Sequence, residues 1–266
     1  MKYYKLDRDT KAYLKRMAVD GIKTPADIYS VNDFIVGLKD FNLWGNIAFW
    51  PLRSLQNAGS GNIVYSLGGL RMPTATHDGV WTSNGISLSS TQQISASLID
   101  LGQDITVLFC GAGNGTTYGS FPMIFGVQSS STFLSNEIRF ASNGGAGDAQ
   151  GFHRNSSGDF LTSTAVLNGM SASTNFVFHS ISSSVGGTIR IRNLRNGTSA
   201  SGASPTSGVA KLNRLQINGR WNAGSLDLAN PMTASFCAIF LPSNINSIDL
   251  IYSFYKSTLG KGLGLP

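Results

Sequence analysis

Most of the chain, from about residue 60 onward, is a succession of short apolar runs separated by clusters of Gly, Asn and Ser. The runs are rich in β-branched and aromatic residues and have the length of strands. They cover residues 63–66, 86–88, 94–98, 105–110, 123–127, 137–141, 175–182, 188–194, 212–218 and 234–241. Because no helical pattern separates these runs, they predict a mainly β fold, an antiparallel sandwich and not alternating βαβ units.

The first part of the chain reads as helix. In residues 7–18 the apolar side chains recur at helical spacing, with Asp7 or Asp9 as the N-cap and Gly21 as the stop. A second helix with one apolar stripe is predicted to open at a Thr-Pro pair and to cover residues 24–44. A hairpin of two short helices cannot bury its own stripe, so it must pack on the sandwich, on a symmetry mate or on another protein.

The end of the chain returns to helix. Asn244 or Ser247 can cap a run whose apolar residues share one face, and Gly260 follows as the stop. The glycine-rich tail after it either packs back on the sandwich or frays. We divide the chain into an N-terminal helical attachment segment, residues 1–58, and a jelly-roll sandwich with its terminal helix, residues 59–266.

The composition favours an exposed surface of neutral polar residues. Charged residues are 13% of the chain, about half of the usual ~25%, while 31 residues are glycine. The net charge of +6 raises the question of nucleic acid, but Arg190 and Arg192 share a strand face without the interleaved aromatic residues that single-strand binders use. No window approaches the ~18 apolar residues of a membrane span, and residues 1–5 are not followed by the apolar stretch of a signal peptide, so we expect neither. We expect neither nucleic acid nor a membrane as partner.

The two cysteines, Cys110 and Cys237, lie more than a hundred positions apart, each within an apolar run. Lone core cysteines behave as small hydrophobic residues, so we expect two buried free thiols. A disulfide between facing strands is the alternative.

The chain lacks the residue patterns of the common hydrolases. A sandwich glycosidase needs two carboxyl groups with different environments, yet Glu137 is the only glutamate and has no Asp at i+2 or i+4. His77, His153 and His179 are scattered, and no G-x-S-x-G elbow is present. We therefore predict a protein that is not an enzyme and has no metal site or cofactor. Calcium held by distant carboxylates and carbonyls, and an Asp-only hydrolase, are the alternatives.

Several segments together resemble a known group. These are residues 31–39 followed by Leu-Trp at 43–44, the apolar segment 47–69, GVWTSNGI at 79–86, LQING at 215–219 and the ending IYSFYKSTLGKGLGLP at 251–266. They are similar to concanavalin-A-like or laminin-G-like jelly-roll domains of tailed bacteriophage virion proteins. The calcium pattern of laminin-G and lectin relatives has no matching positions in this chain.

The resemblance implies a virion protein: a capsid decoration or cement protein, a head fibre or a component of a tail fibre. Its partners would be other virion proteins of the capsid or tail and further copies of itself in an oligomer. The helical hairpin would be the contact to them. The alternative function is a glycan-binding module that recognises a polysaccharide on the host surface, with a polysaccharide-degrading enzyme as a third hypothesis.

Two residue pairs combine a planar side chain with hydrogen-bond donors, as a sugar site requires. They are Arg220 with Trp221, and His153 with Arg154. We take these four residues as candidate ligand-binding residues in the loops or on the concave face of the sandwich. The alternative is a structural role, in which Trp221 covers one end of the core and Arg154 is an ordinary polar residue of a loop.

Overall fold

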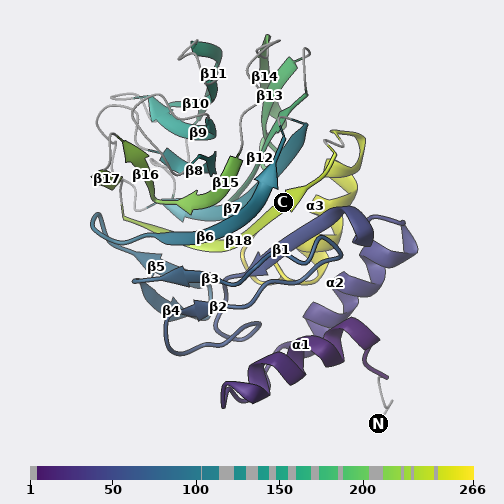
Figure 1. The fold of residues 1–266 in the computed structure, drawn as a ribbon. Coiled ribbons are helices and arrows are strands. Elements are labelled where there is room, and N and C mark those ends of the chain that lie inside the picture. Colours follow the sequence, from purple (N-terminus) through teal and green to yellow (C-terminus); the bar gives the residue numbers. More distant parts are fainter. Residues whose placement is uncertain are drawn as a thin grey trace.

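The fold is a three-layered assembly of two antiparallel sheets and one layer of helices (Figure 1). It is known from a computed structural model, which describes residues 5–102, 104–113, 123–129, 137–143, 148–154, 160–168, 174–184, 188–203, 212–222, 225–228, 231–242 and 245–266. The predicted mainly β, jelly-roll type of sandwich with helices at both ends is confirmed.

Sheet A is the middle layer. Its strands run in the order β14-β13-β12-β7-β18-β5-β4, and β1 also pairs with β18. They are β1 (Ile47–Pro51), β4 (Val80–Thr82), β5 (Gly85–Leu88), β7 (Ile105–Gly113), β12 (Val177–Ser183), β13 (Thr188–Asn193), β14 (Thr198–Ala203) and β18 (Met232–Phe240).

Sheet B packs on one face of sheet A, with the strand order β11-β10-β9-β8-β15-β6-β3-β2. Its members are β2 (Ile63–Val64), β3 (Ala75–His77), β6 (Ile94–Leu101), β8 (Met123–Gln128), β9 (Glu137–Asn143), β10 (Asp148–Arg154), β11 (Phe160–Asn168) and β15 (Leu212–Ile217). A separate hairpin of β16 (Gly219–Asn222) and β17 (Ser225–Leu228) lies against β8 and β15.

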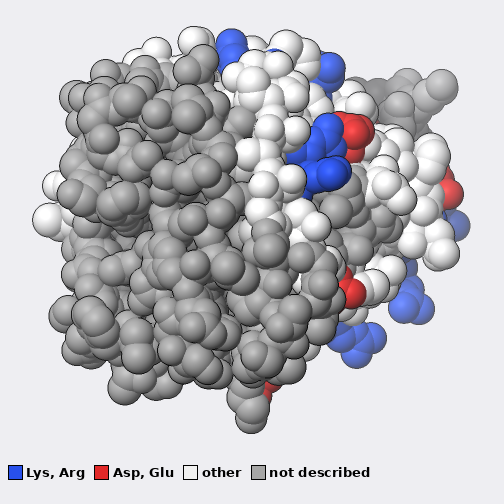
Figure 2. All heavy atoms as spheres, turned by 90° about the horizontal axis from the view of Figure 1, so that it is seen from above, with Lys and Arg blue, Asp and Glu red and all other residues white. Residues whose placement is uncertain are grey.

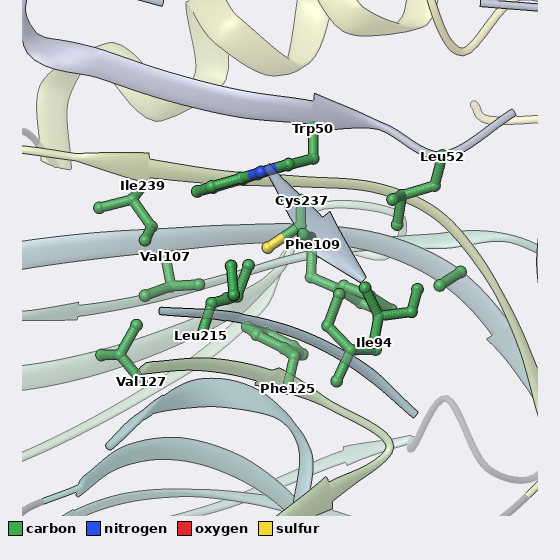
Figure 3. Packing of buried hydrophobic residues seen from close by; sticks show 14 of the residues in the cluster. Trp50, Leu52, Ile94, Val107, Phe109, Phe125, Val127, Leu215, Cys237 and Ile239 are labelled. Atoms are coloured by element: carbon green, nitrogen blue, oxygen red, sulfur yellow. The ribbon is translucent and has the colours of Figure 1, made fainter. Parts of the chain in front are cut away.

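The core between the two sheets is mainly aliphatic. Figure 3 shows Trp50 reaching from β1 toward Cys237 and the side chains of sheet B below them. Phe109 of β7 stacks on Phe125 of β8, with ring centroids 4.7 Å apart. The indole nitrogen of Trp50 donates to the carbonyl oxygen of Pro73 at 3.1 Å, so the one polar atom of this buried ring is satisfied.

The helices cover the other face of sheet A. They are α1 (Arg8–Val19), α2 (Ile28–Asp40) and α3 (Ile248–Ser257), with single 3₁₀ turns at Trp44–Asn46 and Ile245–Ser247. The stripe of α2 that includes Phe34 packs edge-on against Phe49 of β1 and Phe236 of β18. Of the three partners predicted for the helical hairpin, the sandwich itself therefore covers its apolar stripe.

The second helix begins later than predicted. A buried Pro25 precedes a turn, and the N–H of Asp27 donates to the carbonyl oxygen of Leu55 at 2.7 Å, so the helix starts at Ile28. It ends at Asp40 because Asn42 adopts a positive φ of 57°, and no continuous helix reaches Trp44.

The C-terminal tail packs back on the protein. The N–H of Gly260 caps α3 by donating to the carbonyl oxygen of Tyr255 at 2.7 Å. The guanidinium of Arg53 donates to the carbonyl oxygens of Leu259 and Lys261, and Leu263 is buried. The division of the chain after residue 58 stays a prediction, although β1 within the first segment is a strand of sheet A.

The cysteines are both free and buried, as predicted. Cys237 faces the core between the sheets and Cys110 faces the helices, so the two thiols lie on opposite sides of sheet A. Burial raises the pKa of Cys110 to about 12, so the thiolate form is suppressed at neutral pH.

Candidate functional site

The four residues predicted to bind a ligand lie on two separate strands. Arg220 and Trp221 are on β16, opposite Asp227 and Leu226 of β17. His153 and Arg154 are on β10. The positions of these four side chains lie outside what the structure describes, so their role stays a prediction. In sheet B, β8 and β9 separate β10 from β15, the strand that β16 follows.

Basic residues do not form a phosphate track on the described part of the face in Figure 2, where Lys and Arg are scattered and some have an acidic neighbour. The cluster at residues 190–195 follows this pattern. Arg192 forms a bidentate ion pair with Asp249 of α3 at 2.8 and 3.2 Å. Arg195 donates to the carbonyl oxygen of Phe176 at 2.7 Å. These two guanidinium groups therefore serve internal contacts.

A groove between α1 and the loop 66–72, here called the α1 groove, has the features of a binding site. Its volume is about 620 Å³, within the usual range of small-ligand sites of roughly 300–1,000 Å³. Among the side chains that line it are Arg8, Tyr13, Arg16, Trp44 and Arg71. α1 lies at the lower end of the molecule in Figure 1, next to the helix α2.

The helical period of α1 places its arginines in the groove. Tyr13 and Met17 face inward and are buried. Arg8, Ala12 and Arg16 are spaced i, i+4 and i+8, so they form one exposed stripe along the neighbouring face of the helix. All three residues of the stripe line the groove.

The opposite wall depends on two glycines that approach the backbone of other segments. Gly68 has a φ of +120°, and a Cβ there would lie 2.1 Å from the carbonyl oxygen of Ile47. The N–H of Gly69 donates to the carbonyl oxygen of Trp44 at 2.9 Å, and a Cβ on Gly69 would lie 2.6 Å from that oxygen. Residues with larger side chains would push the loop away and change the width of the groove.

Trp44 presents a partly exposed indole between the two walls. Phe49 holds it edge-on, with ring centroids 6.4 Å apart. The ammonium of Lys39 lies 5.3 Å from the centre of the indole ring. These contacts orient the ring without burying it.

The acidic residues of this region are held by one lysine. The ammonium of Lys39 contacts Asp7 at 2.6 Å and Asp9, a residue of the groove lining, at 2.5 Å. Burial alone would raise the pKa of Asp7. The hydrogen bonds from Lys39 and from the N–H of Asp9 have a larger, opposite effect, so the pKa lies below its ordinary value. A glycosidase requires a carboxylic acid with a raised pKa. The lowered pKa of Asp7 is the opposite of what such an acid requires.

No group of three or more His, Cys, Asp or Glu residues that could hold a metal ion occurs within the described residues. Glu137, the only glutamate, is on β9 opposite Gln128 of β8 and Arg154 of β10. None of the described helices is both long and apolar enough to span a membrane.

The α1 groove was missed in the sequence because its charges look like solvated surface. Lysines and aspartates alternate with Arg8 and Arg16, and Trp44 reads as the end of the second helix. The i, i+8 spacing of Arg8 and Arg16, which places both on one helix face, is the only feature of the sequence that indicates this site. The groove itself forms from segments about 50 residues apart, as in the hydrogen bond from Arg16 to the carbonyl oxygen of Ser66.

No protein family matches the sequence, and no curated protein matches it. Solved structures match the fold. The botulinum neurotoxin serotype D binding domain has a TM-score of 0.56 at 10% identity, covering 80% of this chain and 52% of that one. The serotype D ligand binding domain in complex with N-acetylneuraminic acid has a TM-score of 0.55 at 11% identity, with coverages of 80% and 52%. The serotype C1 binding domain has a TM-score of 0.53 at 8% identity, covering 79% of this chain and 51% of that one.

The shared feature is the sandwich fold. This chain spans about half the length of these neighbours. The jelly-roll part of the resemblance is therefore supported, and these neighbours are binding domains. None of the three is a virion protein.

Proposed function

We propose that this chain is a non-catalytic binding module that recognises a glycan at the α1 groove. The observation that carries the proposal is the oriented, partly exposed indole of Trp44 between walls that carry Arg8, Arg16 and Arg71. The C–H face of a sugar ring packs on an aromatic face, and its hydroxyls accept hydrogen bonds from guanidinium groups. A groove with one flat apolar surface and several convergent donors suits such a ligand.

Two further points support a binding role. The serotype D neighbour was solved with a sugar, N-acetylneuraminic acid, so a protein that contains this fold can serve glycan recognition. The carboxylates of Asp7 and Asp9 beside the groove are both ion-paired with Lys39, and the pKa of Asp7 is lowered, which favours binding over acid-catalysed hydrolysis.

The test is binding of the purified chain to an array of surface oligosaccharides, followed by isothermal titration of those retained. Trp44→Ala should weaken binding about tenfold or more, the equivalent of ~1.4 kcal/mol. Trp81→Ala is the matched control, because Trp81 is also partly exposed but donates to the carbonyl oxygen of Gly61, away from the groove. A glycan bound equally well by the parent and Trp44→Ala, or no glycan bound at all, would reject the proposal.

A structural role in a virus particle is the second candidate. It draws on the resemblance to phage virion proteins and on apolar side chains exposed on and after α2, namely Tyr29 at 54%, Val36 at 37% and Phe41 at 52%. In this candidate the outer surface of the hairpin contacts another copy of the chain. Sedimentation equilibrium should show an oligomer that Phe41→Ser dissociates and Val80→Ser, at the 62% exposed Val80 of β4, leaves intact. A parent that remains monomeric at high concentration contradicts it.

A further inference from the structure

We infer that the ligand of the α1 groove is an anionic polysaccharide, one that carries carboxylate or sulfate groups along its chain. The inference rests on the proposed glycan-binding function and narrows its substrate class. It follows from the charge of the groove, from the spacing of its arginines and from the scarcity of exposed aromatic residues beside them.

The groove has an excess of positive charge. Arg8, Arg16 and Arg71 are exposed and have no acidic partner among the described residues. Asp9, the acidic residue of the lining, is occupied by Lys39. Negative groups on a ligand would therefore meet three guanidinium groups against one carboxylate of the described lining, which is itself ion-paired with Lys39.

One of the arginines is already oriented. The guanidinium of Arg16 donates to the carbonyl oxygen of Ser66 and lies 6.0 Å from the centre of the Tyr13 ring. A guanidinium has five N–H donors in a planar fork, so the remaining N–H groups can bind a carboxylate or sulfate in a bidentate manner. The loss of side-chain entropy on binding is smaller for a group held in this way.

The spacing of the arginines favours a polymer over a small anion. Arg8 and Arg16 are eight residues apart on α1, which corresponds to roughly 12 Å along a helix axis. That rise separates their backbone positions, and the guanidinium of Arg16 is held at the carbonyl oxygen of Ser66, so an extended ligand suits the pair better than a single small ion. A chain with negative groups at intervals can contact both, while Arg71 on the facing wall contacts it from the other side.

A single-stranded nucleic acid fits the groove less well. Such ligands are bound by successive aromatic platforms on which the bases stack. Of the two aromatic residues in the described lining, Tyr13 is 0% exposed, so among these residues Trp44 alone offers a ring face. One stacking surface among three arginines suits one sugar ring with charged substituents on either side.

The experiment compares size-matched ligands by isothermal titration with the full chain. The ligands are a neutral dextran oligosaccharide, an oligogalacturonate, a heparin-derived oligosaccharide and an oligothymidylate. The two acidic saccharides should bind at least tenfold more tightly than dextran, and affinity should fall between 50 and 200 mM salt. Oligogalacturonate carries carboxylates alone and the heparin fragment carries both carboxylates and sulfates, so tight binding of oligogalacturonate would show that carboxylates suffice, and binding of the heparin fragment alone would indicate its sulfates.

The variants separate a specific site from general charge attraction. Arg8→Ala combined with Arg71→Ala should weaken acidic-saccharide binding at least tenfold. Lys11→Ala combined with Lys15→Ala is the matched control, because it removes two charges from exposed positions of α1 outside the groove lining and should have little effect. Equal losses in both double variants would contradict the inference.

The remaining outcomes distinguish the inference from the function on which it rests. Dextran bound as tightly as the acidic saccharides, with loss of binding in Trp44→Ala, would keep the glycan function and overturn its anionic class. Tighter binding of oligothymidylate through Arg8 and Arg71 would also overturn it. Failure of every saccharide to bind would remove both proposals.

Discussion

The two cores on either side of sheet A differ in chemistry. The core between the sheets is dominated by Ile, Val, Leu and Ala, with few buried aromatic rings. The core between sheet A and the helices is rich in aromatic rings, and several of them are tyrosines. The Tyr13 hydroxyl donates to the carbonyl oxygen of Gln56 at 2.9 Å, and the Tyr252 hydroxyl donates to that of Pro266 at 3.1 Å.

This difference separates the core that fills the sandwich from the core that positions the helices. Aliphatic residues fill the space between two sheets in any sandwich, and that core belongs to the fold shared with the structural neighbours. Tyrosines fill volume and also bond to defined backbone atoms, so they set the position of the helices and the tail. α1 forms one wall of the α1 groove, and the aromatic core therefore determines the shape of the candidate site.

Truncating a ring at the centre of the aromatic core should have the largest effect. Phe236 contacts Phe34, Phe49, Phe178 and Tyr255, with ring centroids between 4.6 and 6.1 Å apart. Phe236→Ala should lower the free energy of unfolding by about 3–5 kcal/mol. Urea unfolding followed by far-UV and near-UV circular dichroism measures it.

Phe109→Ala makes the same chemical change in the aliphatic core and is the control. Because β18 contributes residues to both cores, we expect secondary and tertiary signals to be lost together in both variants. A separate early transition of the helical signal in Phe236→Ala would mean that the two cores unfold independently.

The second-largest effect on stability is expected at the buried guanidinium of Arg53, which connects the segment after β1 to the C-terminal tail. Arg53 is 8% exposed and donates to the carbonyl oxygens of Ser83, Leu259 and Lys261 at 2.7–2.9 Å. Arg53→Met keeps much of the volume but leaves these acceptors without their donor, at a cost of about 2–3 kcal/mol. Arg190→Met, at an exposed position of β13, should change stability by less than about 0.5 kcal/mol. Chemical denaturation of both variants measures these changes. Equal stabilities of the two variants would mean that the hydrogen bonds of Arg53 to the tail do not stabilise the fold.

Strands with one wet face and long strands with two covered faces could both be predicted from the sequence, since β7, β12 and β18 are buried along almost their whole length and were found as apolar runs. β13 alternates buried and exposed residues and was found by its period of two. β1 is buried along its whole length between the two cores. Its five-residue apolar run has no period, so the sequence did not identify it as a strand.

The candidate site depends on contacts between distant segments. Lys39 and Asp7 are 32 positions apart, and the loop 66–72 reaches α1 only because Gly68 lies against Ile47. Composition identified these residues as charged surface and turn. Which charges neutralise each other, and which remain free beside Trp44, is a property of the folded chain.

The aliphatic core contains a histidine that should make stability depend on pH. His179 lies on β12 between the inward-facing Val177 and Ile181, and burial lowers its pKa to about 3. In the unfolded chain its pKa is about 6.5. Between these values only the unfolded state binds the proton, so stability is full above pH ~6.5 and falls as the pH decreases.

This contribution should be about 1.4 kcal/mol for each pH unit between roughly pH 6 and 4. His179→Leu should remove that slope, which urea unfolding at a series of pH values measures. Ile181→Val, on the same face of the strand, should lower stability by a constant amount at every pH. Parallel pH curves for the parent and His179→Leu would show that other groups cause the acid sensitivity.

The smallest effect is expected at the edge of the helical layer, where the carboxylate of Asp7 has two roles. One oxygen accepts from the N–H of Asp9 at 2.8 Å as the N-cap of α1, and it also contacts Lys39 at 2.6 Å. Asp7→Asn keeps an N-cap and removes the charge, so it should cost about 0.2–1 kcal/mol, the range of exposed ion pairs. Asp7→Ala also removes the cap and should cost about 1 kcal/mol more.

The two variants should differ in their response to acid. The lowered pKa of Asp7 means that its ion pair stabilises the fold above the unfolded pKa of about 3.9 and is lost as the pH falls through the folded value. The gap between the parent and Asp7→Asn should therefore close in acid, while the gap between Asp7→Asn and Asp7→Ala should persist. A stability difference between the parent and Asp7→Asn that is independent of pH would contradict a role for the Asp7 ion pair. The effect of Asp7 would then be capping alone, and Lys39 would be bound by Asp9.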